Sequence, residues 1–432
     1  MRHSRRVIPL CLLAALAGAP LVSASGFGLF QHGGRAMGQV GAFTARAPEP
    51  SALTYNPAAI TRLDGLQLQA GLDFNNASDK YTSATGAFSG RHIIQFPPAV
   101  YLTWKQKQGP FALGLGVDSP FYYSLDWNKA LFPGRFLARR TELRVYEIHP
   151  VVAYDLGEGW SIGGGLRYAL GNLDQDDNAR LLFSTSPPGT IPQPILIEVE
   201  RNASSDVDAF GWDLAVHYAA PSWGWGAVYR SPERLKGNGD ASYKARDVPS
   251  GFPSLDAAIS ARLVNGSSRQ SFELPREARV GVWYAPYPEL RVELDAAYLS
   301  WSSLEATDVT YDPNVFGDGP TVRTPRDWKN TTSLRLGIEG DLTDSFAVFG
   351  GIAQEPSPVP GRTLEPGFPR GDALVYGGGF TVNLPKISFD VGYSLHDHDN
   401  NDAVNQELFQ PGRRGSYSAK DQVWGFAVRW RL

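Results

Sequence analysis

The sequence has almost no cysteine, no repeated long hydrophobic runs and no large excess of charge. A single Cys among 432 residues excludes a disulfide framework and any cysteine-based metal site. The formal net charge of -4 gives no reason to expect nucleic-acid binding. The mean hydropathy of -0.25 excludes a polytopic helical membrane protein, because each helical span would need about 20 consecutive apolar residues.

The one apolar stretch of comparable length lies at the N-terminus, and we interpret it as an export signal. Arginines within residues 1–6 precede an apolar core at 7–20, and small residues follow at 22–24. This three-part layout is that of a secretory signal peptide. We therefore expect residues 1–24 to be removed and the rest to reach the outer membrane of a Gram-negative bacterium. The alternative is a single membrane anchor.

From Gly65 onward, apolar residues repeatedly alternate with small or polar residues. Successive strand side chains point to opposite faces, so each segment has one apolar face and one charged or glycine-rich face. Aromatic residues such as Trp424, Trp430 and Tyr298 lie at the ends of the apolar faces. A lipid-facing apolar band with aromatic girdles explains this better than a soluble sandwich does. The sequence predicts an all-β fold, a transmembrane β-barrel.

The number of alternating segments supports this prediction. We expect a 14-stranded antiparallel barrel, and an even number is usual for bacterial barrels. Short and long connections alternate between the segments, as expected for periplasmic turns and extracellular loops. The segments occupy 65–74, 97–105, 111–117, 143–155, 159–171, 206–218, 223–231, 276–286, 289–300, 329–341, 344–354, 373–383, 386–396 and 419–432.

Residues 25–64 do not follow the alternating pattern. They are rich in glycine and proline and include scattered apolar residues such as Phe43 and Ile60. A barrel of this size is too wide for its own side chains to fill. We therefore predict that 25–64 form an N-terminal hatch, or plug, in the lumen of a barrel formed by 65–432. A periplasmic tail is the alternative.

Several motifs, in a fixed order, are shared with a known family. The hatch region contains Ser25-Gly26-Phe27, Gly34-Arg35-Ala36 and Asn56-Pro57-Ala58-Ala59-Ile60-Thr61. The barrel region continues with Ser119-Pro120-Phe121, Tyr229-Arg230-Ser231-Pro232 and Asp327-Trp328-Lys329. In this order the sequence resembles the FadL family of outer-membrane transporters for long-chain fatty acids and other hydrophobic compounds.

The resemblance implies passive transport without a cofactor. A substrate would land in a groove between extracellular loops, move to an inner pocket, and leave sideways through a kinked third strand at 111–118. Residues with implied roles are Gly26, Phe27 and Leu29 in the inner pocket, with Asn56, Pro57, Ala58, Gly114 and Gly116 at the lateral opening.

Two predicted loops carry apolar residues that suit such a groove. Residues 254–264 predict a short helix, with Ser254 as a plausible N-cap and apolar residues at intervals of four. Apolar residues in external loops need a reason, and a landing groove is one. The alternative is that the loops pack on each other. The candidates are Leu181, Leu182, Phe183, Ile195, Ile197, Leu255, Ile259 and Leu263.

A fatty acid would also need a cationic partner for its carboxylate. The candidates are Arg35, Arg139, Arg140, Arg167 and Arg335, although lumen charges can instead pair with acids such as Glu293, Asp295, Glu339 or Asp390. The choice between a fatty acid and a neutral aliphatic or aromatic hydrocarbon stays open at this point.

Other chemistry finds little support in the sequence. The run His396-Asp397-His398-Asp399 is interpreted as a solvated loop rather than a metal site, and no Gly-x-Ser-x-Gly elbow is present. We expect no enzyme activity, metal or cofactor. We expect a monomer that contacts outer-membrane lipid and lipopolysaccharide, is inserted by the barrel-assembly machinery, and binds a hydrophobic small molecule. The competing functions are a surface adhesin or receptor and a general porin.

Overall fold

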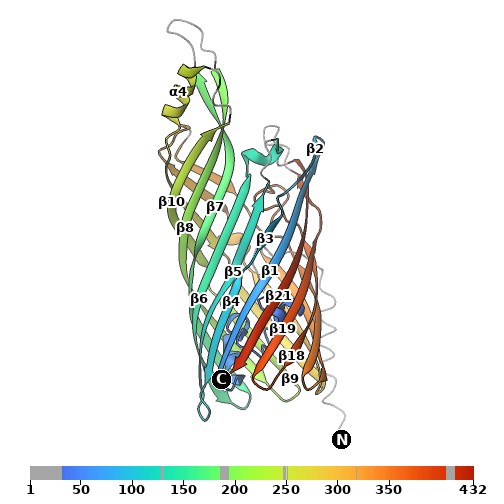
Figure 1. Ribbon diagram of the computed structural model, residues 1–432. Coiled ribbons are helices and arrows are strands. Elements are labelled where there is room, and N and C mark those ends of the chain that lie inside the picture. The colour runs from blue at the N-terminus through green and yellow to red at the C-terminus, as the bar shows by residue number, and fades with distance from the viewer. Residues whose placement is uncertain are drawn as a thin grey trace.

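The described residues form one closed antiparallel barrel. A computed structural model describes residues 32–127, 131–184, 194–246, 250, 252–317, 319–404 and 414–432. Within them, 14 wall strands form the barrel, which closes where β1 pairs with β21 (Figure 1). No helix in this described part of the chain is long and apolar enough to cross a membrane. The predicted signal peptide at 1–24, with Gly26, Phe27 and Leu29, lies outside the described residues.

Several wall strands are assembled from two consecutive segments. The wall strands are β1 (Gly65–Ser83), β3 (Ile93–Gln95) continued by β4 (Pro98–Lys105), β5 (Phe111–Asp126), β6 (Arg140–Gly157), β7 (Trp160–Ser184), β8 (Pro194–Ala219), β9 (Trp223–Arg230) continued by β10 (Glu233–Ala245), β11 (Gly266–Leu274) continued by β12 (Glu277–Tyr287), β13 (Leu290–Leu299) continued by β14 (Ala306–Asp312), β15 (Thr321–Pro325) continued by β16 (Thr331–Thr343), β17 (Phe346–Glu355), β18 (Ala373–Asn383), β19 (Ile387–His398) and β21 (Arg414–Arg431).

Shorter elements complete the fold. Two further strands are β2 (Gly86–Ser89) and β20 (Asn401–Val404), and the helices are α2 (Gly34–Gly38), α3 (Ala52–Tyr55), η1 (Pro57–Arg62), η2 (Pro133–Phe136), α4 (Pro253–Arg262) and η3 (Trp301–Ser303).

The predicted period-two alternation of apolar and polar side chains is confirmed along the wall strands. Along β4, the large apolar side chains of Val100, Leu102 and Trp104 are exposed outward, whereas Tyr101 and Thr103 are buried on the inner face. Apolar residues that face outward around the barrel match a lipid-facing surface. The polar side chains of the strands are collected inside, where they find partners.

The strands extend well beyond the predicted segments. β7 and β8 remain paired as far as Ser184 and Pro194, so most of the predicted loop at 172–205 is strand. The predicted loop at 232–275 likewise contains β10, α4 and β11. Those loop predictions were wrong, because apolar alternation marks only the part of a strand that faces lipid. Backbone pairing continues where the outward face becomes polar, while the inward face keeps apolar residues such as Leu181 and Ile197.

The described part of the predicted hatch lies inside the barrel, at the end near the C-terminus (Figure 1). Helix α2 contacts β17, β18, β19 and β21, whereas η1 contacts the run of strands from β4 to β8. The backbone of the hatch packs directly against the backbone of the wall. A Cβ added to Gly392 of β19 would lie 1.9 Å from the carbonyl oxygen of the hatch residue Gly34. Residues 36–45 and 50–61 are buried throughout, so this segment fills the lumen at that end.

Candidate functional site

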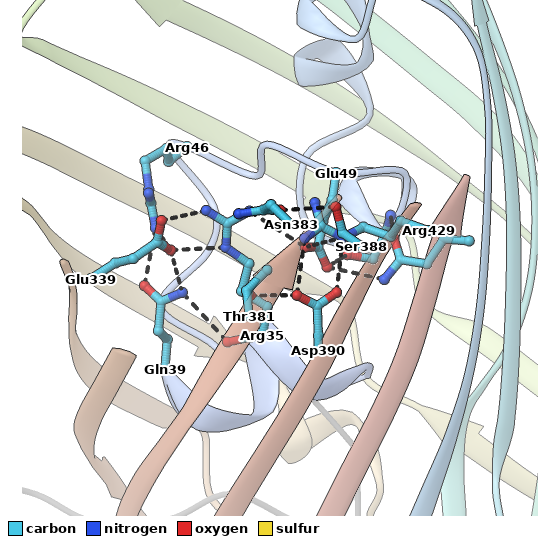
Figure 2. Close-up of polar contacts among 12 residues, drawn as sticks. Arg35, Gln39, Arg46, Glu49, Glu339, Thr381, Asn383, Ser388, Asp390 and Arg429 are labelled. Carbon is cyan, nitrogen blue, oxygen red and sulfur yellow. Dashed lines mark hydrogen bonds and ion pairs between the residues drawn. The ribbon is translucent and has the colours of Figure 1, made fainter. Parts of the chain in front are cut away.

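Buried ion pairs fix one side of the hatch to the barrel wall (Figure 2). The Glu339 carboxylate on β16 accepts hydrogen bonds from Arg35 Nε at 2.8 Å and Arg46 NH2 at 2.7 Å. Gln39 donates to the same carboxylate at 3.2 Å. Arg291 on β13 also pairs with it, at 3.1 Å. One buried carboxylate therefore ties three hatch residues to two adjacent wall strands.

A second group of charges holds the neighbouring part of the hatch. Hatch residue Glu49 lies 3.8 Å from Arg35 and 3.7 Å from Arg429 of β21. Arg429 in turn donates two hydrogen bonds, at 2.8 and 2.9 Å, to Asp390 of β19 (Figure 2). Burial without partners would be costly for each of these charges. Their pairing explains why charged residues occur on the inner face of the wall.

Backbone groups of the hatch are also bound by wall carboxylates. Asp295 on β13 accepts hydrogen bonds from the N–H groups of Phe43 and Thr44, both at 2.9 Å. Glu293 accepts from the N–H of Ala45 at 2.6 Å. The sequence had pointed to four lumen acids, and all four have structural partners. Glu293, Asp295 and Glu339 bind the hatch directly, and Asp390 binds Arg429 of β21.

The Asn-Pro-Ala motif shapes the hatch but does not lie at the third strand. Asn56 accepts from the N–H of Ala58 at 3.1 Å and so starts η1. Its amide donates to the carbonyls of Thr44 and Val216, at 2.9 and 3.2 Å. A Cβ added to Gly163 of β7 would lie 2.8 Å from Ala58 N. The structure therefore places Asn56, Pro57 and Ala58 against β7–β9, whereas the helix η1 that begins with Pro57 also contacts β5.

Other hatch residues contact the third strand instead. A Cβ added to Gly114 of β5 would lie 2.2 Å from Leu53 Cδ2, and one added to Gly116 would lie 3.7 Å from Leu53 Cδ1. The next hatch residue, Thr54, hydrogen-bonds through its hydroxyl to the Asp118 carboxylate, which also accepts from Tyr101 at 2.9 Å. Gly114 and Gly116 thus make room for the hatch.

The irregularity in β5 lies further along the strand than predicted. Both glycines are in regular register with β4 and β6. The register with β6 shifts between Asp118 and Phe121, where β5 carries one extra residue. Pairing of β5 with β4 stops at Val117, because Pro98 begins β4 and offers no N–H.

Beyond this bulge, β5 is paired on one side only within the described residues. It remains paired with β6 to Asp126, but no strand pairing joins it to β3. At the end of β5, the N–H of Arg91 donates to the carbonyl of Asp126 at 2.6 Å, and this bond marks the end of the stretch without a partner strand. The hydrogen-bond ladder of the wall is therefore interrupted between β3 and the second half of β5, and the two strands stay in contact without pairing.

An apolar layer with many aromatic rings lies inside the barrel above the hatch. Trp127 and Phe132 stack at 4.7 Å between ring centroids, and Tyr123 and Phe368 at 5.2 Å. This inner apolar cluster comprises Tyr81, Phe121, Tyr123, Leu125, Trp127, Phe132, Leu143, Val145, Ala169, Leu173, Val207, Ala209, Leu235, Phe272, Leu274, Leu299, Trp301, Leu304, Trp328, Leu364, Phe368 and Tyr417.

The segment 356–372 covers part of this cluster. Tyr123 Oη donates to the carbonyl of Gly367, and Trp127 Nε1 donates to that of Pro366, both at 2.9 Å. These bonds attach the segment to β5 and to the residue that follows it. The sequence had shown these aromatic residues only as members of strands or weak motifs. Nothing in their spacing indicated that they would meet.

A small polar cavity separates the inner apolar cluster from the hatch. Its volume is about 20 Å³, close to the room needed by one water molecule. Its lining includes Phe121 and Leu299 from the cluster, Thr54 from the hatch, and the buried arginines Arg167 and Arg230. A large substrate could enter this region only if the cluster opened.

Arg230 differs from the other arginines of this cavity. Arg167 pairs with Glu147 and, at 3.3 Å, with Glu233. Arg230 donates to the carbonyl oxygen of Thr54, its Nε has no hydrogen-bond partner, and no described carboxylate lies within ion-pair distance. The buried carboxylates of Asp118, Asp213, Glu233 and Glu277 attract the Arg230 charge from beyond ion-pair distance, so this guanidinium is compensated without a direct ion pair. In the sequence, Arg230 stands out only as part of the motif Tyr229-Arg230-Ser231-Pro232.

The arginines proposed from sequence as carboxylate partners are already paired. Arg35 binds Glu339, Arg139 binds Glu200 at 2.8 Å, and Arg335 lies 3.7 Å from Glu355. Arg139 and Arg140 also line a crevice on the outer side of the wall rather than the lumen. The alternative that these charges pair with protein acids therefore fits the structure better.

A second apolar cluster occupies the wall extension near α4. It brings together Leu181, Phe183 and Ile197 with one face of α4, where Leu255, Ile259 and Leu263 lie. Leu182 and Ile195 are exposed. The helix begins at Pro253 after Phe252 at the N-cap, so the predicted N-cap role of Ser254 was wrong. The remaining members of this outer apolar cluster are Val199, Ala203, Ala241, Tyr243, Ala245, Val309, Tyr311, Val315, Phe316 and Val322.

The two histidines of the acidic run have local partners. His396 Nε2 is 3.1 Å from Ser394 Oγ, and His398 Nδ1 is 3.0 Å from the carbonyl of Gly371. Across the part of the chain that the structure describes, no group of three or more His, Cys, Asp or Glu is arranged to hold a metal ion.

Comparison with known proteins agrees with this architecture. Residues 15–432 match the family model described as outer membrane protein transport protein (OMPP1/FadL/TodX). No curated protein matches the chain.

Solved structures share the fold at low sequence identity. A Pseudomonas aeruginosa FadL homologue has 18% identity and a TM-score of 0.79, with 94% of this chain and 99% of that chain covered. The P. putida toluene transporter TodX has 14% identity and a TM-score of 0.70, with 93% and 98% covered. The CymD monoaromatic hydrocarbon channel has 17% identity and a TM-score of 0.67, with 94% and 98% covered.

Proposed function

Because the chain belongs to the OMPP1/FadL/TodX family of outer-membrane transport proteins, we propose that it admits hydrophobic molecules by passive diffusion and releases them sideways into the membrane. The family and the similar structures are transport proteins rather than enzymes. The observation that carries the proposal is the interruption of the wall at the β5 bulge, beside the cavity under the inner apolar cluster.

Capture begins at the outer apolar cluster in this proposal. Leu255, Ile259 and Leu263 of α4 face Leu181 and Ile197 of the wall extension, so parting them would expose a continuous apolar groove. Burial of one CH₂ is worth about 0.8 kcal/mol, and a long acyl chain therefore offers on the order of 10 kcal/mol. Capture is thus favourable without an energy source, and release becomes the difficult step.

The inner apolar cluster provides the next site. Within the described residues, the cavity directly beneath it has a volume of about 20 Å³. The substrate would displace side chains attached to the segment 356–372 through Tyr123 and Trp127. An acyl chain that passes through the inner apolar cluster replaces contacts between aromatic side chains by contacts with itself. Its apolar surface therefore stays out of water throughout.

Arg230 supports an acidic head group on at least some substrates. It lies at the polar side of the cavity, without a described carboxylate within ion-pair distance. A fatty-acid carboxylate there would accept a hydrogen bond from the guanidinium, whose Nε has no partner in the described structure. We therefore favour long-chain fatty acids over neutral hydrocarbons as substrates.

Release would occur through the unpaired side of β5. Pro120 and Phe121 line the inner cavity, whereas Tyr122 and Ser124 line a crevice on the outer side of the same strand. The bulge therefore has cavities on both of its faces. Sideways exit delivers the apolar chain to lipid and avoids its transfer into water, which would cost the free energy gained at capture.

Removal of the bulge tests this route. Deleting Ser119 and replacing Pro120→Val would give β5 the same number of residues as β6 between the pairs Asp118–Glu147 and Phe121–Val145. The inward and outward faces are preserved. Deletion of Leu342, at the register shift between Asp341 and Thr343, is the matched control.

The assay is uptake of labelled oleate by cells that lack their own fatty-acid transporter. We expect cells that carry the native protein or the Leu342 deletion to take up oleate. At equal surface abundance, uptake by cells with the Ser119 deletion and Pro120→Val, the closed variant, should fall to that of cells without the protein. Undiminished uptake by the closed variant would refute sideways exit. Equal uptake with and without the native chain would instead favour an adhesin or receptor.

The porin alternative has its own measurement. The hatch, the small cavity and the inner apolar cluster follow one another along the lumen and block an aqueous path. We therefore expect that liposomes containing the protein do not swell in solutions of small sugars. Swelling at the rate of an open porin would contradict the proposal.

A further inference from the structure

A large crevice lies on the outer side of the wall, where β3 and β5 are not paired. Its volume is about 760 Å³. It is distinct from the lumen, because inward residues of β5 and β6 such as Tyr123 and Leu143 belong to the inner apolar cluster. The lining residues are Arg91, His92, Ile93, Ile94, Gln95, Tyr122, Ser124, Asp126, Arg139, Arg140, Glu142, Arg144 and Asp176.

The crevice begins where the lipid-facing band ends. On the outer face of β6, exposed Ile148 is followed by Tyr146, whose ring packs edge-on against Tyr122 at 6.4 Å between centroids. The next outward residue is Arg144, whose cross-strand neighbour is Asn172. Aromatic rings mark the membrane–water interface of barrels. The polar lining therefore faces the head-group layer of the outer leaflet.

The charges of the crevice are arranged with the cations outermost. Arg91 pairs with Asp126 at 3.2 Å, with the arginine side chain 64% exposed and the aspartate 11%. Arg140 and Arg144 both contact Glu142, and their side chains are 36% and 44% exposed whereas that of Glu142 is 3% exposed. Asp126 and Glu142 thus lie under three guanidiniums. The lining also includes the Arg139–Asp176 pair, at 3.8 Å, whose side chains are 17% and 15% exposed.

We propose that this crevice binds the phosphorylated head group of an outer-leaflet glycolipid, with Arg91, Arg140 and Arg144 as its phosphate ligands. Guanidiniums bind phosphate oxygens through paired, charge-assisted hydrogen bonds. The buried acids hold the three side chains in place before binding, which reduces the entropy lost on binding. A crevice of about 760 Å³ accommodates a phosphorylated sugar and is far larger than one substrate carboxylate requires.

The position of the crevice gives the bound glycolipid a further consequence. Tyr122 and Ser124 belong to both the crevice and the unpaired part of β5. A head group held there would place ordered lipid at the mouth of the wall interruption. Binding itself is independent of the proposed transport, so the two can fail separately.

Binding is tested on the full-length protein in detergent by native mass spectrometry with purified bisphosphorylated lipid A. The variant combines Arg91→Gln, Arg140→Gln and Arg144→Gln. The control combines Arg269→Gln, Arg323→Gln and Arg362→Gln, which removes the same charge from arginines outside the crevice. Further arms use dephosphorylated lipid A, phosphatidylglycerol and inorganic phosphate.

We expect the crevice variant to bind lipid A about tenfold or more weakly than the native protein, since charge-assisted hydrogen bonds are lost. The control should bind as the native protein does, and dephosphorylated lipid A should bind weakly to all three. Equal affinity of the crevice and control variants would overturn the assignment. Displacement of lipid A by inorganic phosphate or phosphatidylglycerol at similar concentrations would also overturn it, by showing a general anion site. Loss of folding is monitored by the heat-induced mobility shift of the barrel.

Discussion

Contact between the hatch and β5 is open to a quantitative test at Gly114. A Cβ at this position would lie 2.2 Å from Leu53 Cδ2, and Leu53 is fully buried. Ordinary carbon contacts are at about 3.5–4.0 Å, so the Leu53 methyl would have to retreat by roughly 1.5 Å. Because the hatch is held by ion pairs on its other side, we expect Gly114→Ala to destabilise the protein by about 1–3 kcal/mol.

The opposite change provides the second arm of a double-mutant cycle. Leu53→Ala alone should cost about 2–5 kcal/mol, because it leaves a cavity in the buried cluster of the hatch. With Gly114→Ala in the same chain, the new methyl occupies part of that cavity. The combined loss should therefore fall short of the sum by about 1–2 kcal/mol.

Urea unfolding of the protein in lipid vesicles, followed by tryptophan fluorescence, measures each free energy. Gly378→Ala on β18 is the matched control, since its nearest atom to the new Cβ is the carbonyl oxygen of Phe349 at 3.8 Å. A strand glycine replaced by alanine without a clash should be neutral or stabilising by about 0.5–1 kcal/mol. If Gly114→Ala behaved like this control, the close contact between Leu53 and β5 would be refuted.

Three further predictions concern charged residues. Glu339→Gln should destabilise the protein by about 3–5 kcal/mol, because it leaves the guanidiniums of Arg35 and Arg46 without their carboxylate. Cleavage of the hatch by protease should also become faster. An unchanged free energy of unfolding would contradict this anchoring role. Hydrogen bonds from Arg135 and neighbouring groups lower the pKa of Glu198 in the wall extension to about 2. A lowered carboxyl pKa contributes stability above about pH 4.5 that is lost as the pH falls toward 2, so protease resistance of the extension should drop across this range and Glu198→Gln should abolish that dependence. Arg230→Met should reduce oleate uptake more than uptake of an alkane of equal length, and an equal reduction would argue against a carboxylate site.

The barrel could be predicted because its cause is local. The period-two alternation in a segment such as 386–396 needs no knowledge of distant residues, and β19 indeed spans Ile387–His398. The lumen-filling role of the segment that starts at Ser25 was predicted from its composition and from barrel size, and its described residues 36–45 and 49–61 are largely buried. The strand extensions were missed because, beyond the lipid, the outward face becomes polar and the apolar alternation that marked the strands becomes less regular.

The candidate site depended on distant partners, which the sequence does not contain. Glycines suggested a kink at Gly114, but a glycine in a strand can equally make room for a packed neighbour. The structure provides that neighbour in Leu53, and it locates the irregularity near Ser119 and Pro120. Arginines likewise look alike in sequence, and only their surroundings separate the paired Arg335 from Arg230.

By itself, the sequence determined a lipid-facing barrel with an internal N-terminal segment, because side-chain periodicity and lumen size are properties of chain order. Only the tertiary structure decided which wall strand lacks a partner, which buried cation lacks a carboxylate, and which arginines face outward. Those features depend on distances between residues that are far apart in the chain. Electrostatic and packing free energies depend on these distances, so the closed barrel had to form before the proposed pathway could be identified.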